Sequence, residues 1–316
     1  MRAPRLASLA LVLALVTVVL ALYLGPLRDD GRDPPQATAV APDVAGLPEP
    51  GGSLEPRSPA PVRLTGVDAF ALRFRKPPRA ALVFDVDDGE VLYRRRPLTV
   101  LPMASLTKIM TALVVTQETE PDERVRITKA ALRYQGSGVG VLPKGKRVRL
   151  EWLMNGLMLV SGNDAAIALA VHVSGNERKF VRLMNEKARL WGLRCTRFTS
   201  SHGLEDGNRS CAADLAVMTR LAMRNRRIAR ITRRAQVSFP FPIKGGRLYL
   251  AGHNPLLRAG YRGAIGLKTG FTNTAGRCFV GVARRGGRTL AVVLLDSPNP
   301  LKHSVKLLNL GFSVAA

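Results

Sequence analysis

Apolar residues occur along this chain in three kinds of run, and each kind predicts a different structure. An uninterrupted run from Leu6 to Leu24 is about as long as a helix that crosses a bilayer. Short runs rich in branched residues predict β-strands at 80–86, 91–93, 278–282 and 289–295. Longer runs predict helices at 150–160, 177–190, 212–224 and 301–310, and one more that begins near Ala104.

The predicted strands and helices are grouped in blocks. Two strands joined by the turn residues 87–90 come first, a helical block follows, and three strands come last, one of them near 266–270. This order favours an α+β fold in which distant parts of the chain complete one sheet. We therefore expect an antiparallel sheet of about five strands flanked by helices, with a largely helical insert between the N-terminal and C-terminal strands.

The N-terminal part of the chain divides into an apolar segment and a linker. Residues 1–27 are typical of a signal anchor or a signal peptide, and the length of the apolar run favours an uncleaved anchor. Arg2 and Arg5 precede that run, which favours an N-terminus in the cytoplasm and the remaining chain outside it. Prolines and glycines mark 28–61 as a linker, so we expect the folded domain at 62–316.

The net charge of +25 bears on partners more than on the fold. The arginines are scattered, without a zinc-finger pattern or interleaved aromatic residues, so we expect no nucleic-acid partner. A basic surface suits an anionic polymer or a membrane face equally well. Six arginines gather in one stretch, which we expect to be a solvated helical face: Arg224, Arg226, Arg227, Arg230, Arg233 and Arg234.

The three cysteines are too dispersed to predict a metal centre. Cys195, Cys211 and Cys278 form no CxxC motif and no cluster with histidine, so we expect neither a metal nor a cofactor. Outside the cytoplasm Cys195 and Cys211 could be bridged, although their spacing alone leaves this open. Cys278 falls in a predicted strand, where we expect a packed thiol.

A serine and a lysine one helical turn apart are the first candidates for chemistry. In the helix near Ala104, Ser105 and Lys108 would lie on one face. A buried lysine readily loses its proton, and a neutral amine beside a hydroxyl can generate an attacking alkoxide. Taken alone, the pair is better explained as a helix-capping serine with a solvated lysine.

Two further motifs change that interpretation. Ser161-Gly162-Asn163 interrupts the helical block, and Lys268-Thr269-Gly270 precedes a turn at 273–276. Each alone could be only a helix cap or a turn. Together and in this order, the three motifs resemble the S-x-x-K, S-x-N and K-T-G elements of penicillin-recognising serine enzymes. The residues around them, including His202-Gly203-Leu204, are similar to low-molecular-mass penicillin-binding proteins of the serine-type D-alanyl-D-alanine carboxypeptidase family, over about residues 65–315.

The resemblance assigns roles on the helical side of the expected site. It makes Ser105 the nucleophile and Lys108 the nearest candidate base, although which lysine acts as the base stays open. Ser161 would relay a proton to the leaving amine, and Asn163 would bond both Lys108 and the substrate amide. His202 is expected to hold a loop or to lie at the cleft edge, because a lysine already supplies the base.

On the strand side, the resemblance implies substrate binding. Lys268 would stay charged, attract a carboxylate and lower the proton affinity of Lys108. The Thr269 hydroxyl would bind a terminal carboxylate, and Gly270 would let substrate approach the backbone. The N–H of Phe271 would form an oxyanion hole with the N–H of Ser105.

The resemblance therefore implies a serine-type carboxypeptidase that removes the terminal D-alanine of peptidoglycan stem peptides through an acyl-Ser105 intermediate. β-Lactams would be covalent inhibitors, and the enzyme would lie at the outer face of a bacterial cell membrane, anchored by its N-terminal segment or secreted. The alternatives are a β-lactamase, a DD-endopeptidase and a non-catalytic wall-binding module.

Overall fold

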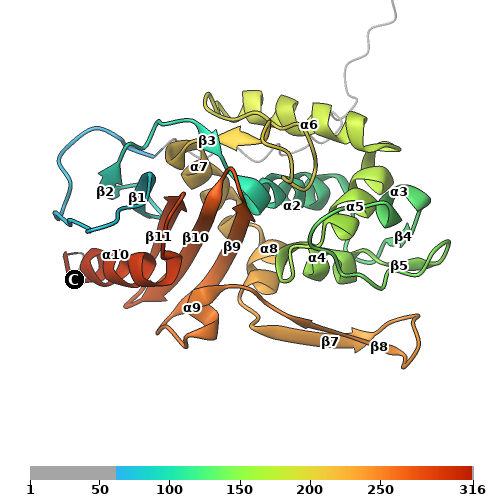
Figure 1. The fold of residues 1–316 in the computed structure, drawn as a ribbon. Coiled ribbons are helices and arrows are strands. Elements are labelled where there is room, and N and C mark those ends of the chain that lie inside the picture. Colours follow the sequence, from blue (N-terminus) through green and yellow to red (C-terminus); the bar gives the residue numbers. More distant parts are fainter. Residues whose placement is uncertain (1–61, 315–316) are drawn as a thin grey trace, which may run out of the picture. The chain divides into compact units, whose positions relative to one another are not determined.

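A five-stranded antiparallel sheet joins the two ends of the region that the computed structural model describes, residues 62–314 (Figure 1). Its strand order is β2-β1-β11-β10-β9, so that Ala80 of β1 pairs with Leu295 of β11. The strands span Ala80–Asp85 (β1), Val91–Arg95 (β2), Ala264–Thr272 (β9), Gly276–Arg285 (β10) and Arg288–Leu295 (β11). The expected α+β fold with a sheet of about five strands is confirmed.

The strands are apolar on both sides because helices cover both faces of the sheet. Successive side chains of a strand point to opposite faces. In β1, Leu82 and Phe84 pack in the larger core with α2 (Thr107–Glu118), α7 (Ala212–Arg224) and α8 (Arg226–Thr232). Val83 packs in the smaller core against α10 (Pro300–Val314). Full burial of one such Leu or Phe contributes roughly 1.5–3 kcal/mol, so the two cores fix the strand register.

The helical insert forms the other half of the domain (Figure 1). Its helices are α3 (Lys129–Leu132), α4 (Leu150–Met158), α5 (Asn163–Ser174) and α6 (Glu177–Leu190). The predicted helices at 150–160, 177–190 and 212–224 are confirmed within two residues at each end. The side chain of Asn176 begins α6 by accepting a hydrogen bond from the Lys179 backbone N–H at 2.9 Å.

Several short elements were not predicted. They are β3 (Leu101–Pro102), β4 (Arg124–Arg126), β5 (Arg147–Arg149), β6 (Arg209–Ser210), β7 (Gln236–Pro240), β8 (Arg247–Ala251) and α9 (Pro255–Arg258). The β7–β8 hairpin projects from the domain, and Phe239 stacks on Trp152 with ring centroids 5.3 Å apart (Figure 1). Each of these elements is only two to five residues long, too short for a periodic pattern to stand out in the sequence.

The predicted solvated face of arginines is confirmed in part. Arg224, Arg226, Arg230 and Arg233 are exposed. Two neighbours are instead half-buried and bonded: Arg227 Nε lies 2.7 Å from Glu151 Oε1, and Arg234 Nη1 donates to Asn155 Oδ1 at 3.1 Å. These two side chains face α4, because helix α8 packs against α4 on that side.

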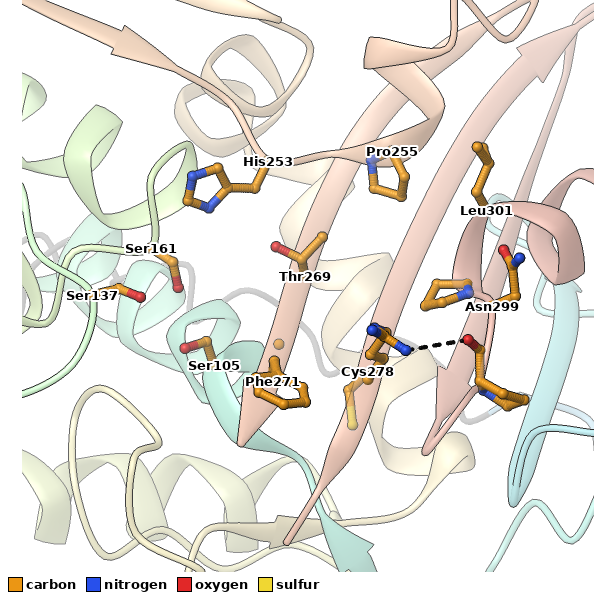
Figure 2. A pocket seen from close by; sticks show the side chains of 14 residues that line it. Ser105, Ser137, Ser161, His253, Pro255, Thr269, Phe271, Cys278, Asn299 and Leu301 are labelled. Atoms are coloured by element: carbon orange, nitrogen blue, oxygen red, sulfur yellow. Dashed lines mark hydrogen bonds between the residues drawn. The ribbon is translucent and has the colours of Figure 1, made fainter. Parts of the chain in front are cut away.

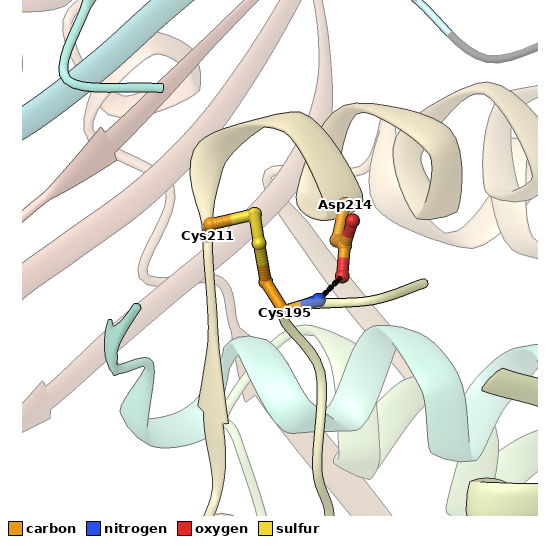
Figure 3. A group of neighbouring side chains, drawn as sticks. All are labelled: Cys195, Cys211 and Asp214. Carbon is orange, nitrogen blue, oxygen red and sulfur yellow. Dashed lines mark hydrogen bonds between the residues drawn. A yellow bond between two sulfur atoms is a disulfide. The ribbon is translucent and has the colours of Figure 1, made fainter. Parts of the chain in front are cut away.

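The structure shows whether Cys195 and Cys211 are bridged, which their spacing in the sequence left open. Cys195 and Cys211 form a disulfide with their Cα atoms 5.5 Å apart (Figure 3). The carboxylate of Asp214 accepts hydrogen bonds from the backbone N–H of Cys195 and the Thr196 hydroxyl, both at 2.7 Å. Burial raises the pKa of Asp214. Cys278 is a buried free thiol, as predicted.

The N-terminal predictions lie outside the described residues. These are the apolar segment 1–27 and the linker 28–61. Within residues 62–314, no helix has both the length and the apolar character that a bilayer span requires.

Candidate active site

Ser105 and Lys108 lie side by side where the first helix begins. Ala104–Leu106 forms a 3₁₀ turn (η1), and α2 continues from Thr107. The i, i+3 spacing brings Lys108 Nζ to 3.0 Å from Ser105 Oγ. Every residue of α2 from Thr107 to Val115 is buried, so the lysine is held inside the domain rather than in solvent. The alternative of a solvated lysine is therefore wrong.

Lys108 Nζ is surrounded by three acceptors and contacts no carboxylate among residues 62–314. Besides Ser105 Oγ, it donates to Asn163 Oδ1 at 2.7 Å and to the backbone carbonyl of His202 at 2.6 Å. Burial holds the pKa of Lys108 well below its usual range, and the charge of Lys268 lowers that pKa further. A neutral amine keeps two N–H donors for Asn163 and His202 and turns its lone pair to the Ser105 hydroxyl.

The second motif lies at the break between α4 and α5. Ser161 adopts a left-handed backbone conformation (φ 62°), which is unfavourable for a residue with a side chain and is often found at functional sites. Asn163 begins α5, and its Nδ2 donates to the Gln135 carbonyl at 2.6 Å. Because that bond fixes the amide orientation, Asn163 Oδ1 points at Lys108.

A buried carboxylate that sequence reasoning missed supports this break. Asp164 is fully buried, and its carboxylate accepts hydrogen bonds from the backbone N–H groups of Val139 (2.8 Å), Gly140 (2.9 Å) and Ala165 (2.8 Å). These bonds hold the 135–140 loop in place. The same loop supplies the Gln135 carbonyl that orients Asn163.

The third motif lies on the free edge of the sheet. Strand β9 pairs on one side with β10 and forms an outer strand, so its other edge faces the helices. Lys268 Nζ donates to Ser161 Oγ at 3.0 Å and to the Thr269 carbonyl at 2.9 Å. Lys268 is only 1% exposed, and burial lowers its pKa to about 7. The sequence does not reveal this burial.

Gly270 explains how strand and helix meet so closely. A Cβ at this position would lie 3.0 Å from both Met103 O and Ser105 N. A side chain there would force β9 away from η1, so the glycine is required for the approach. The next residue, Phe271, is 62% exposed. The backbone N–H of Ser105 therefore lies against the edge of β9, where the predicted oxyanion hole was expected.

His202 and Gly203 belong to a loop that closes over the start of α2. The His202 ring accepts a hydrogen bond from the Leu204 N–H at 3.3 Å, and its carbonyl receives Lys108. The prediction that His202 holds a loop is confirmed. Gly203 has a φ of +84°, and a Cβ there would lie 2.1 Å from Ala104 O. This loop therefore allows no other residue at position 203 without moving η1.

The three motifs open into one cleft of about 610 Å³ (Figure 2). Ser105 and Ser161 lie on its helical side, and Thr269, Gly270 and Phe271 lie on its strand side. The lining also includes residues that the sequence did not single out, among them Ser137, His253, Arg277 and Asn299. Arg277 is exposed and follows the turn after β9, whereas burial lowers the pKa of His253. No aspartate or glutamate lines this cleft within residues 62–314.

Comparison with known proteins agrees with this arrangement. The family model described as D-alanyl-D-alanine carboxypeptidase (peptidase S11) matches residues 76–299. The chain belongs to this family. It is therefore a hydrolase of the D-alanyl-D-alanine carboxypeptidases, related to the penicillin-binding proteins, as the sequence predicted.

Individual relatives of the S11 family share most of the domain. D-alanyl-D-alanine carboxypeptidase DacB2 of Mycobacterium tuberculosis is 39% identical over 222 residues, which cover 69% of this chain and 75% of the relative. A D-alanyl-D-alanine endopeptidase of Pseudomonas aeruginosa is 32% identical over 230 residues, covering 71% and 73%. The crystal structure of a D-alanyl-D-alanine carboxypeptidase from M. tuberculosis superposes with a TM-score of 0.72 at 35% identity, covering 77% of this chain and 94% of that one.

Proposed function

We propose that this enzyme removes the terminal D-alanine from peptidoglycan stem peptides through an acyl-Ser105 intermediate. The observation that carries the proposal is the 3.0 Å contact between Ser105 Oγ and the buried amine of Lys108. Burial holds the pKa of Lys108 well below its usual range, which favours the neutral amine that can act as a base, and the Ser105 hydroxyl is the group beside it that it would deprotonate.

Acylation begins when Ser105 Oγ attacks the carbonyl carbon of the penultimate D-alanine and its proton passes to Lys108 Nζ. The negative charge that develops on the carbonyl oxygen is stabilised by the N–H groups of Ser105 and Phe271, which the close approach of β9 to η1 would place together. Asn163 keeps the amine aimed at Ser105 throughout this step, because its amide is fixed at its other end by Gln135.

The carbon–nitrogen bond then breaks, and the departing D-alanine amine needs a proton. Ser161 donates it, since its oxygen already accepts a hydrogen bond from Lys268 and its own hydroxyl proton is free to turn toward the cleft. Lys108 passes the proton that it took from Ser105 to Ser161, so Lys108 is neutral again and Lys268 keeps its charge. Water completes the cycle by hydrolysing the acyl-Ser105 ester: Lys108 takes a proton from the attacking water and returns it to Ser105 Oγ as the ester bond breaks. Phe271 and Thr269 line the strand side along which the peptide is bound.

The terminal carboxylate of the substrate is bound by the Thr269 hydroxyl and by Arg277, with the charge of Lys268 behind them. Lys268 is too buried to be the sole partner of a substrate carboxylate. Arg277 is an exposed guanidinium in the cleft lining, and guanidinium groups match carboxylates in geometry. This recognition distinguishes a chain end from a mid-chain peptide bond.

Endopeptidase activity is the second candidate function. A 32% identical relative is named a D-alanyl-D-alanine endopeptidase. Cleavage of cross-links uses the same residues and differs only in the group beyond the scissile bond. β-Lactamase activity is disfavoured, because no carboxylate of residues 62–314 lines the cleft to activate a deacylating water. β-Lactams are therefore expected to acylate Ser105 and remain attached.

For the location, we propose an enzyme that acts outside the cytoplasm and is attached to the bacterial membrane by residues 1–27, with 28–61 as a tether. The apolar run and the extracytoplasmic substrate of the family support this proposal. Detection of a mature N-terminus near Asp29, in protein released from membranes, would contradict the anchor.

The function is tested with the full chain, a D-alanyl-D-alanine peptide and benzylpenicillin. The wild type should release D-alanine and gain the mass of one penicilloyl group, and Ser105→Ala should do neither, with a loss of roughly 10⁴-fold or more in rate. Ser137→Ala is the matched control, since Ser137 lines the same cleft without a lysine partner. Penicilloyl mass on Ser105→Ala would refute the assignment. Release from a cross-linked peptide dimer but not from a monomer would favour the endopeptidase.

A further inference from the structure

The end of the sheet farthest from Ser105 carries a second concave surface. A pocket of about 310 Å³ is lined there by Arg224, Arg226, Arg230, Arg233 and Arg284, which we call the arginine face. Its other lining residues include Val86, Ile265 and Thr289. Ile265 is six residues from Phe271 along β9, which corresponds to about 20 Å of strand. The catalytic cleft and the arginine face therefore occupy opposite ends of the same strands.

The arginine face gathers five positive charges around one acidic residue, Asp87. All five guanidinium groups belong to exposed residues. Within residues 62–314, the side chains of Arg226, Arg230 and Arg233 form neither a hydrogen bond nor an ion pair. The Arg284 side chain bonds the Thr289 hydroxyl, at 3.1 Å, and the Arg224 side chain reaches the Asp87 carbonyl at 3.4 Å. Like charges gathered in this way repel each other, so an anion bound there would be stabilised.

The chain enters the domain at the same end of the sheet. Arg63 forms a β-bridge with Glu90, and its N–H donates to the Gly89 carbonyl at 3.0 Å. The turn that contains Gly89 follows β1 directly, and Val86 and Asp87 of this turn line the arginine pocket. Residues 28–61 precede this point, and the apolar run from Leu6 to Leu24 precedes them.

We propose that the arginine face binds the anionic phospholipid headgroups of the membrane that holds the N-terminal segment. The linker can extend on the order of 100 Å, so it does not by itself decide which face meets the bilayer. Charge complementarity decides it, because an arginine near an anionic lipid surface is attracted to it. Docking by this face points the catalytic cleft away from the bilayer, toward the wall. The proposal rests on the proposed membrane attachment and not on the proposed reaction.

The test uses the full chain with a specific protease site inserted in the linker 28–61. The protein is reconstituted into vesicles of phosphatidylcholine, or of phosphatidylcholine with phosphatidylglycerol, and the linker is then cleaved at about 0.1 M salt. Sedimentation before cleavage reports anchoring by the N-terminal segment. Sedimentation of the released domain after cleavage reports the arginine face alone, and D-alanine release is assayed separately. The three measurements therefore distinguish a failure of N-terminal anchoring from a failure of docking by the arginine face, and both of these from a failure of the reaction.

The wild-type domain should stay on vesicles that contain phosphatidylglycerol and leave those of pure phosphatidylcholine. The variant R226Q/R230Q/R233Q should bind the anionic vesicles about a hundredfold more weakly, given roughly fivefold for each arginine. The matched control R124Q/R126Q/R147Q removes the same charge from exposed positions of β4 and β5, and should bind within a few-fold of the wild type.

Equal weakening of the two triple variants would mean that net charge alone drives binding, and would overturn the proposal. So would retention that does not depend on phosphatidylglycerol. Inorganic polyphosphate, added at the same phosphate concentration as the lipid, serves as the polymer probe. If it binds the domain more tightly than the vesicles do, and R226Q/R230Q/R233Q loses that binding, the arginine face recognises an anionic polymer instead of lipid.

Discussion

The two walls of the catalytic cleft each bury a lysine, but the two amines have different hydrogen-bond partners. On the helical wall, Lys108 contacts a hydroxyl, an amide oxygen and a backbone carbonyl. On the strand wall, Lys268 contacts only Ser161 and the Thr269 carbonyl. Neither amine forms an ion pair within residues 62–314, so burial lowers both pKa values. Both amines contact a serine hydroxyl, so they differ in their other partners, which for Lys108 include the Asn163 amide oxygen.

The causes of the two pKa shifts differ as well. The pKa of Lys108 is lowered by burial and also by the charge of Lys268, whereas only burial lowers that of Lys268, to about 7. The proposed mechanism requires a neutral Lys108 beside a charged Lys268.

The largest expected effect comes from Lys108→Arg. A guanidinium does not lose its proton at any accessible pH, so this variant lacks the base, and acylation by benzylpenicillin should fall by roughly 10³–10⁴-fold. Stopped-flow or mass-spectrometric acylation rates measure it. The comparison variant is Lys268→Arg, which keeps its charge and should retain measurable acylation. If Lys108→Arg acylates normally and Lys268→Arg does not, the roles of the two walls are reversed.

A second prediction concerns the pH profile of the strand wall. For a substrate with a free carboxylate, kcat/KM should decline as pH rises through about 7, because Lys268 then loses its charge. In the complex, the substrate carboxylate raises the pKa of Lys268, so kcat should decline only at higher pH. Lys268→Arg should remove the alkaline limb and lower kcat/KM by roughly 10- to 100-fold through altered shape. An alkaline limb that persists in Lys268→Arg would assign it to another group.

On the helical wall, Asp164→Asn tests whether the 135–140 loop positions Asn163. The substitution replaces one acceptor oxygen by an amide NH2 donor that faces backbone N–H groups, which should cost about 2–3 kcal/mol of stability. For a domain of this size the melting temperature should fall by roughly 5–10 °C. Because Asn163 then loses its support, kcat should fall by about tenfold while KM changes little. Asp122→Asn, an exposed carboxylate, is the control and should change neither quantity.

The smallest effect on catalysis is expected from the Cys195–Cys211 disulfide, which lies on neither wall. Replacing both cysteines by serine opens a loop with a sequence separation of 16 and should reduce stability by about 3 kcal/mol. Neither cysteine lines the cleft, so kcat/KM should stay within about twofold. Thermal unfolding and a peptide assay on the same sample measure both quantities. A large loss of kcat/KM below the melting transition would show that the disulfide supports the site.

The parts of the fold that the sequence predicted are those with a strong local pattern. The helix at Glu177–Leu190 and the strands that flank Gly286 have continuous periodicity, whereas the β7–β8 hairpin is held by Trp152 from another helix. Nothing in residues 236–251 reveals that distant contact. The burial of Lys268 was not predicted for a related reason, because it depends on residues far away in the chain.

The site residues that the sequence identified also belong to strong local patterns. Each motif places its residues within four positions, and the resemblance of the three motifs to those of a known family identified Ser105, Asn163 and Lys268. The groups that it missed act through the backbone or from remote segments: the His202 carbonyl on Lys108, and Asp164 on the 135–140 loop. Nothing in the sequence marked Arg277 as a cleft residue, because one more arginine in so basic a chain is not distinctive.

The pairing of β1 with β11 determines when the cleft can form during synthesis and folding. Ala80 has no strand partner until Leu295 has been made, and the serine at 105 has no opposite wall until β9 follows, more than 150 residues later. Contacts so distant in sequence form slowly and late. A ribosome-bound or partly exported chain therefore has a nucleophile but no cleft. Hydrolytic activity begins only after almost the whole polypeptide has reached the compartment in which it folds.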